Sequence, residues 1–123
     1  MDRFFDNFVM TPMNKVVANS LRAHADRDPA GVADAKAQLD ISYEWLDSAM
    51  KSRAWAGGEY FSLADCAAAP ALFYADWVHE IDRGFANVRA YRARLLVRPS
   101  VARVIDEARP YRNLFPLGAP DRD

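Results

Sequence analysis

Cysteine is almost missing from this sequence, since Cys66 is the single one among 123 residues. One thiol excludes an internal disulfide and leaves no cysteine cluster that would hold zinc. Long apolar runs are missing as well, and Asp2 and Asp6 interrupt the stretch where a signal peptide would need its apolar core. We therefore expect a soluble, cytoplasmic protein with no membrane partner and no metal.

Neither sign of charge is in excess. Sixteen basic residues oppose seventeen acidic ones, and no basic stripe is present, so nucleic acid is not an expected partner. Tracts of serine and glycine and blocks of like charge are also absent, while 51% of the residues are apolar and 27% are charged. That composition is typical of a folded chain, and its length suits one domain with one core.

The alternating, β-branched pattern of strands is absent, and apolar residues recur instead at helical spacing. We expect an all-α fold of five helices, at residues 2–23, 32–53, from Ser62 onward, 85–97 and 99–109. Asp28, Pro29 and Gly31 predict a connection between the first two helices. The tail is expected to form an ordered coil, held by Leu114 and Phe115, that frays toward its end.

The first two helices carry clear apolar stripes. The first stripe has the members Phe5, Val9, Met13, Val16 and Leu21, and the second has Val32, Ala35, Leu39, Tyr43, Leu46 and Met50. Pro12 lies within the first helix and removes an amide donor, which predicts a kink between Phe8 and Pro12.

The segment FSLADCAAAPAL, residues 61–72, has the clearest helix start. Ser62 and Asp65 form an S-x-x-D capping box, in which each residue satisfies a backbone amide of the other. Phe61, just before the cap, could pack against Cys66. The alanines that follow let neighbouring elements approach closely, which indicates a central helix whose first amides are satisfied inside the protein.

Few residues suggest chemistry by themselves. Cys66 could be a nucleophile, but no histidine lies at a suitable spacing, so we interpret it as a buried structural thiol. Asp65 could be an acid or base, yet the cap already explains it. His79 with Glu80 and Asp82 could form part of a metal site, although a solvated helix end explains them more simply.

Taken with Gly57-Gly58 before it and RPSVARV at residues 98–104, the FSLADCAAAPAL segment resembles the C-terminal helical domain of cytosolic glutathione transferases. The resemblance extends over nearly the whole chain, residues 1–123, and implies a five-helix bundle. FFDNFVMTPMNKVV, at the start, is similar to the long first helix that lines the active-site cleft of that family and contributes to its dimer contact.

The resemblance implies a pocket without catalytic residues. Family members bind and activate glutathione on an N-terminal thioredoxin-like domain, and nothing in these residues has the pattern of its strands. The chain would supply the hydrophobic pocket for the electrophile and part of a dimer interface, with glutathione as co-substrate rather than cofactor. Its expected partners are the thioredoxin-like domain and a second copy. The alternative is a noncatalytic assembly module, a use of the same helical domain in translation factors.

The resemblance suggests that two helices line the substrate pocket, through the residues Phe8, Thr11, Lys15, Tyr74 and Trp77. Core packing would also explain Tyr74 and Trp77, and solvent exposure would explain the other three. Where the first helix would meet a partner, we expect an apolar surface that is partly uncovered, formed by Phe4, Phe5, Val9 and Met10.

Overall fold

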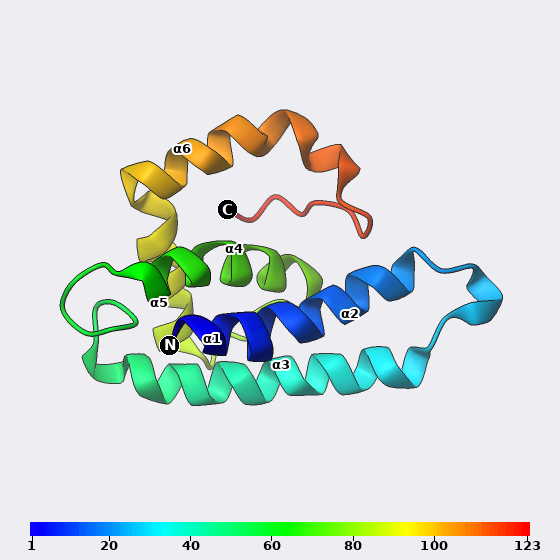
Figure 1. The fold of residues 1–123 in the computed structure, drawn as a ribbon, viewed down its shortest axis with the longest axis horizontal. Coiled ribbons are helices and arrows are strands. Elements are labelled where there is room, and N and C mark those ends of the chain that lie inside the picture. Colours follow the sequence, from blue (N-terminus) through cyan, green and yellow to red (C-terminus); the bar gives the residue numbers. More distant parts are fainter.

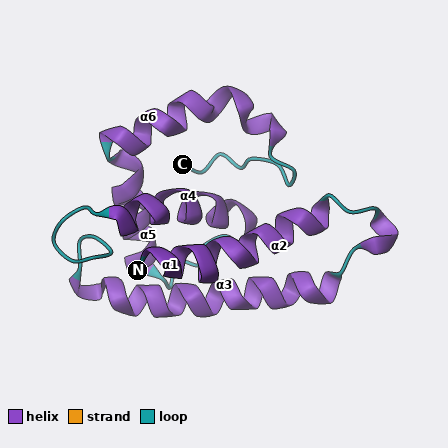
Figure 2. Ribbon diagram, in the orientation of Figure 1, coloured by secondary structure: helices purple, strands orange, loops and turns teal.

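Helices make up the regular structure of this chain, whose computed structural model describes all 123 residues. The first helix runs without interruption through α1 (Asp2–Phe4), a π-helical turn (Phe5–Met10) and α2 (Thr11–Ser20). It is followed by α3 (Pro29–Ala49), α4 (Leu63–Val78), α5 (Ala86–Val97) and α6 (Pro99–Ala108). Counted in this way the chain has five helices and no strand, which confirms the predicted all-α fold (Figure 2).

Helix α4 lies in the middle of the molecule (Figure 1). The α1–α2 helix and α3 lie on one side of it, and α6 lies on the other. The main core, built from α1–α2, α3, α4 and α5, includes the fully buried Phe5, Leu39, Tyr43, Leu72 and Tyr91. A smaller apolar cluster of Phe73, Trp77 and Ile105 joins α6 to α4. The central position predicted for α4 is thus confirmed, and its buried alanines allow the close packing.

The predicted kink near Pro12 takes the form of the π-helical turn, which ends at Met10. A proline has no amide to give, so Pro12 cannot pair with the carbonyl of Phe8, four residues earlier, as a residue in a regular α-helix would. The hydroxyl of Ser42 on α3 donates to that carbonyl at 2.7 Å, and Ser42 is only 2% exposed. The widened turn is therefore held in place from the neighbouring helix.

The second helix begins at Pro29 rather than at residue 32, so the predicted start was wrong. Asp28 is its N-cap, with a side chain that accepts the amide of Gly31 at 3.0 Å, and Pro29 occupies the first turn. Both residue types are common at helix starts, and here the same residues that form the predicted turn also begin the helix. The first helix in turn ends at Ser20, which leaves Leu21 outside the predicted stripe and 69% exposed.

The tail does not fray as predicted. A 3₁₀ helix spans Arg109–Leu114, and the chain then returns below α6 toward α4 (Figure 1). Phe115 packs on α4 as expected, whereas Leu114 is 70% exposed. The last two residues, Arg122 and Asp123, are bonded to groups on α4 and on the 3₁₀ helix.

Candidate functional site

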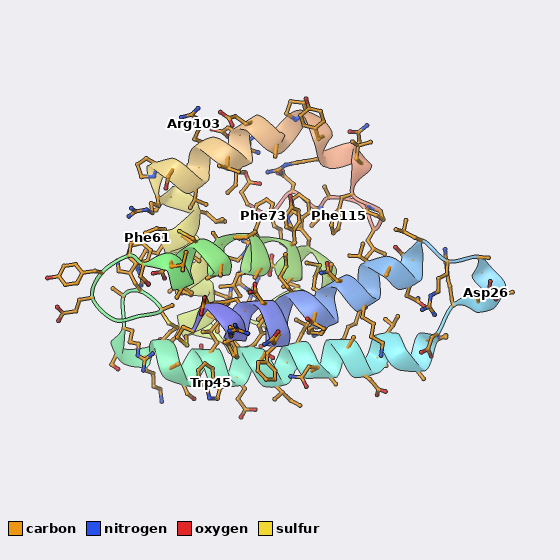
Figure 3. All side chains as sticks on the ribbon, in the orientation of Figure 1. Asp26, Trp45, Phe61, Phe73, Arg103 and Phe115 are labelled. Atoms are coloured by element: carbon orange, nitrogen blue, oxygen red, sulfur yellow. The ribbon has the colours of Figure 1, made fainter.

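An apolar cavity of about 410 Å³ lies between α2, α4, α6 and the tail. Eleven of its fourteen lining residues are hydrophobic, which suits an apolar ligand better than a polar one. Helix α4 contributes Phe73, Tyr74 and Trp77 to the wall, and the tail contributes Phe115. In Figure 3, Phe73 and Phe115 lie on facing segments, α4 and the tail.

Aromatic contacts fix the shape of this wall. The rings of Tyr74 and Phe115 are stacked with centroids 5.7 Å apart, and the ring of Trp77 meets that of Phe115 edge-on at 5.2 Å. The indole nitrogen of Trp77 donates to the carbonyl of Arg122 at 3.0 Å. The polar end of the indole is thereby satisfied, and its apolar face is left for packing or for a ligand.

Of the five residues predicted for the pocket, the structure brings together Tyr74 and Trp77. Phe8 is half-exposed and lies in a separate groove between α1 and α3. Thr11 is exposed and its hydroxyl donates to the carbonyl of Asp6, while Lys15 lines a small crevice beside Asp28. These three side chains point away from the cavity because another face of the first helix is turned toward α4.

That other face carries the site residues that the sequence reasoning missed, Met10, Met13, Asn14 and Val17. Their spacing of three and four residues is itself helical; Met13 belongs to the apolar stripe that the sequence showed, and the other three lie beside it. The signal was present, but the sequence could not say which side of the stripe would border a cavity.

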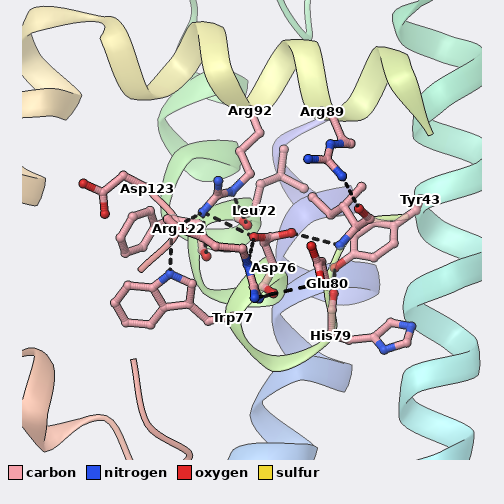
Figure 4. A network of polar contacts seen from close by, with 12 residues as sticks. Tyr43, Leu72, Asp76, Trp77, His79, Glu80, Arg89, Arg92, Arg122 and Asp123 are labelled. Carbon is pink, nitrogen blue, oxygen red and sulfur yellow. Dashed lines mark hydrogen bonds and ion pairs between the residues drawn. The ribbon is translucent and has the colours of Figure 1, made fainter. Parts of the chain in front are cut away.

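A network of buried charges holds the tail against the end of α4 (Figure 4). Asp76, 6% exposed, accepts the amide of Ile81 at 2.9 Å and the Nε of Arg122 at 3.1 Å. Arg92 lies 3.8 Å from the same carboxylate and donates to the carbonyl of Leu72. Burial lowers the pKa of Arg92, and the charge of Asp76 opposes that shift.

Asp123 completes the attachment of the tail. Its carboxylate accepts from Arg109 with one oxygen and from Arg112 with the other. Partial burial alone would raise the pKa of Asp123, but the hydrogen bonds from Arg112 and Arg109 outweigh it and hold that pKa below its usual value.

The predicted capping box is present at the start of α4. Asp65 is fully buried, and its carboxylate accepts the amide of Ser62 at 2.9 Å, the amide of Ala56 at 2.8 Å and the hydroxyl of Tyr91 at 2.5 Å. Burial and this hydrogen bond raise the pKa of Tyr91. With its carboxylate engaged in this way, Asp65 has a structural role.

Cys66 is exposed, so its interpretation as a buried thiol was wrong. It lies on the side of α4 that faces α6 and lines a second apolar hollow of about 330 Å³. Phe61 lines the same hollow, where its ring packs edge-on against Trp55 and lies 3.6 Å from the guanidinium of Arg98.

His79 does not join Glu80 and Asp82. Its Nε2 lies 2.8 Å from a carboxylate oxygen of Asp40 on α3, and its ring stacks with that of Tyr43. No group of three histidine, cysteine, aspartate or glutamate side chains is arranged to hold a metal ion.

The structure is therefore an all-helical domain with a capped central helix and an apolar cavity beside that helix. The chain belongs to the glutathione S-transferase C-terminal domain family, which matches residues 29–94. The match begins with α3, includes the capping box, Tyr74 and Trp77, and ends within α5. No curated protein and no solved structure matches the chain. None of the helices has the length and apolar character needed to cross a bilayer.

Proposed function

We propose that this chain supplies the electrophile-binding pocket of a glutathione transferase. The cavity beside Tyr74 and Trp77 carries the proposal, because it is apolar, lined by aromatic rings and built on the helix that the family match includes. Glutathione is then the co-substrate, bound and activated by a thioredoxin-like domain that these 123 residues, which form no strand, do not contain.

The chain by itself lacks the means to activate a thiol. Conjugation needs a thiolate, and a thiol with a pKa near 8.5 needs a positioned donor or positive field to ionise at neutral pH. Arg112 is the one cationic side chain that lines the cavity, and it is already bonded to Asp123. Lys15 lies outside the cavity. The isolated chain therefore binds the electrophile without conjugating it.

Tryptophan fluorescence tests the binding. The ligand is a chloronitrobenzene, which quenches tryptophan fluorescence and is also an electrophile that glutathione can attack. The Cys66→Ser variant is the parent protein, because the exposed thiol could itself be arylated. Quenching should disappear in Trp77→Phe and persist in Trp45→Phe, since Trp45 lies in a groove on α1 and α3. Glutathione conjugation well above the uncatalysed rate, lost in Tyr74→Ala, would show that this domain carries chemistry we assign elsewhere.

The surface between α1 and α3 supports a second part of the proposal, a contact with a second copy. A groove of about 470 Å³ is lined there by apolar residues that include Phe4, Phe8, Ile41 and Trp45. The same surface would serve the alternative function, a noncatalytic assembly module. We place either function in the cytoplasm, where an exposed single cysteine stays reduced.

A further inference from the structure

The apolar cavity contains one charged side chain, that of Arg112. Its guanidinium carbon lies 5.2 Å from the ring centre of Trp77 and 5.9 Å from that of Phe73, and the side chain is 19% exposed. Contact with two aromatic faces holds the cation at the cavity wall, where water screens it less than at the open surface.

The partner of this cation is a carboxylate of the chain itself. Asp123 bridges Arg112 and Arg109, yet Asp123 does not line the cavity. Its side chain is 34% exposed and belongs to a segment without regular helix. Arg122, next to it, is held separately, through Asp76 and Trp77. The carboxylate of Asp123 can therefore leave the arginines while the tail stays attached.

We propose that the cavity takes apolar ligands that carry a carboxylate, and that Arg112 binds this head group in place of Asp123. The inference rests on the proposed function, because it names the ligand class of the same cavity. An arginine fork binds any carboxylate through charge-assisted hydrogen bonds, so the exchange keeps Arg112 neutralised. The apolar body is then buried against Tyr74 and Trp77.

Competition with Asp123 makes the inference testable. In the parent protein a carboxylate ligand must displace the carboxylate of Asp123. Its charge should therefore raise its affinity only about twofold to threefold over that of a neutral ligand of the same shape. In Asp123→Asn the competitor loses its charge, and we expect the carboxylate ligand to bind about fivefold more tightly than it binds the parent. A neutral ligand of the same shape leaves Asp123 where it is and should bind both proteins equally.

Calorimetric titration with 1-naphthaleneacetate and with the isosteric, uncharged 1-naphthaleneacetamide measures this difference. Arg112→Gln should bring the two dissociation constants together, and Arg112→Lys, which keeps the charge without the fork, should give an intermediate result. Arg103→Gln is the matched control, because Arg103 pairs with Glu107 on the exposed side of α6. Thermal melting of each variant verifies that it is folded.

Two outcomes overturn the inference, and they differ in meaning. If the amide binds and the acetate gains nothing from Asp123→Asn, the cavity has no preference for anions, and the proposed apolar pocket stands. If neither probe binds the parent or Asp123→Asn, the proposed pocket itself fails.

Discussion

At the scale of single residues, the side chain of Asp65 accepts more hydrogen bonds than a helix cap requires. Its buried carboxylate accepts hydrogen bonds from the chain before α4, from the first residue of the cap and from Tyr91 on α5. Three segments are thus joined at one side chain. Removing it leaves three donors without a partner, two of them buried and one partly buried, which costs more than the loss of a cap.

We predict that Asp65→Ala lowers the free energy of unfolding by about 3 kcal/mol or more, against about 0.5–2 kcal/mol for a cap alone. Ser62→Ala is the control, because it removes the other half of the capping box and leaves the carboxylate in place. Denaturant unfolding compares the two. A loss no larger for Asp65→Ala than for Ser62→Ala would contradict the role we give to the buried carboxylate.

The exposed position of Cys66 leads to a second prediction at this scale. Its thiol should react with a disulfide reagent in the native protein at nearly the rate seen in denaturant, because burial does not protect it. Absorbance of the released thiolate measures the rate. Strong protection in the native state would mean that the thiol is buried, as the sequence alone had suggested.

At the scale of elements, the first helix shows how a proline is accommodated. The π-helical turn precedes Pro12, and the hydroxyl of Ser42 on α3 reaches the carbonyl of Phe8 that Pro12 cannot serve. The sequence contained the proline, and from it a distortion could be predicted. It could not reveal the partner, because Ser42 lies 34 residues away from Phe8 and belongs to another helix.

A double-mutant cycle tests this pairing. Ser42→Ala should cost about 1–2 kcal/mol in the parent, since it removes the hydroxyl that donates to the part-buried carbonyl of Phe8. In the Pro12→Ala background the restored amide can serve that carbonyl, and the cost of Ser42→Ala should fall by at least half. Equal costs in both backgrounds, measured by urea unfolding, would show that Ser42 does not compensate for Pro12.

At the scale of the whole molecule, the cavity is formed by three segments that are far apart in the sequence, around Met13, Tyr74 and Phe115. Helical spacing predicted the apolar stripes of the first two helices, and the alanines after the capping box correctly predicted that α4 is central. Spacing could not predict which faces would border a cavity, and the family resemblance suggested Phe8, Thr11 and Lys15, which do not line it. The path of the tail depends on the ion pair between Arg122 and Asp76, which the spacing of apolar residues in the sequence cannot predict.

The exposed apolar surface also belongs to this scale. Phe5 and Val9, expected to be partly uncovered, are fully buried, and the exposed apolar side chains that line the α1–α3 groove are those of Phe8, Ile41 and Trp45. We predict self-association through this surface. Light scattering over a concentration series should show a dimer that Trp45→Glu returns to a monomer. Leu63→Glu, at an exposed position on α4, should have no such effect. A parent protein that stays monomeric at high concentration would contradict the prediction.

The central claim, that the apolar cavity on α4 is the ligand site, is tested most directly by the indole signals of the three tryptophans in a nitrogen–proton NMR spectrum. Trp77 lines the cavity, Trp45 lines the α1–α3 groove and Trp55 packs against Phe61. Titration of the Cys66→Ser protein with a chloronitrobenzene should shift the Trp77 indole signal progressively and leave the other two in place. A shift confined to Trp45, or no shift at saturating ligand, would contradict the assignment of the site.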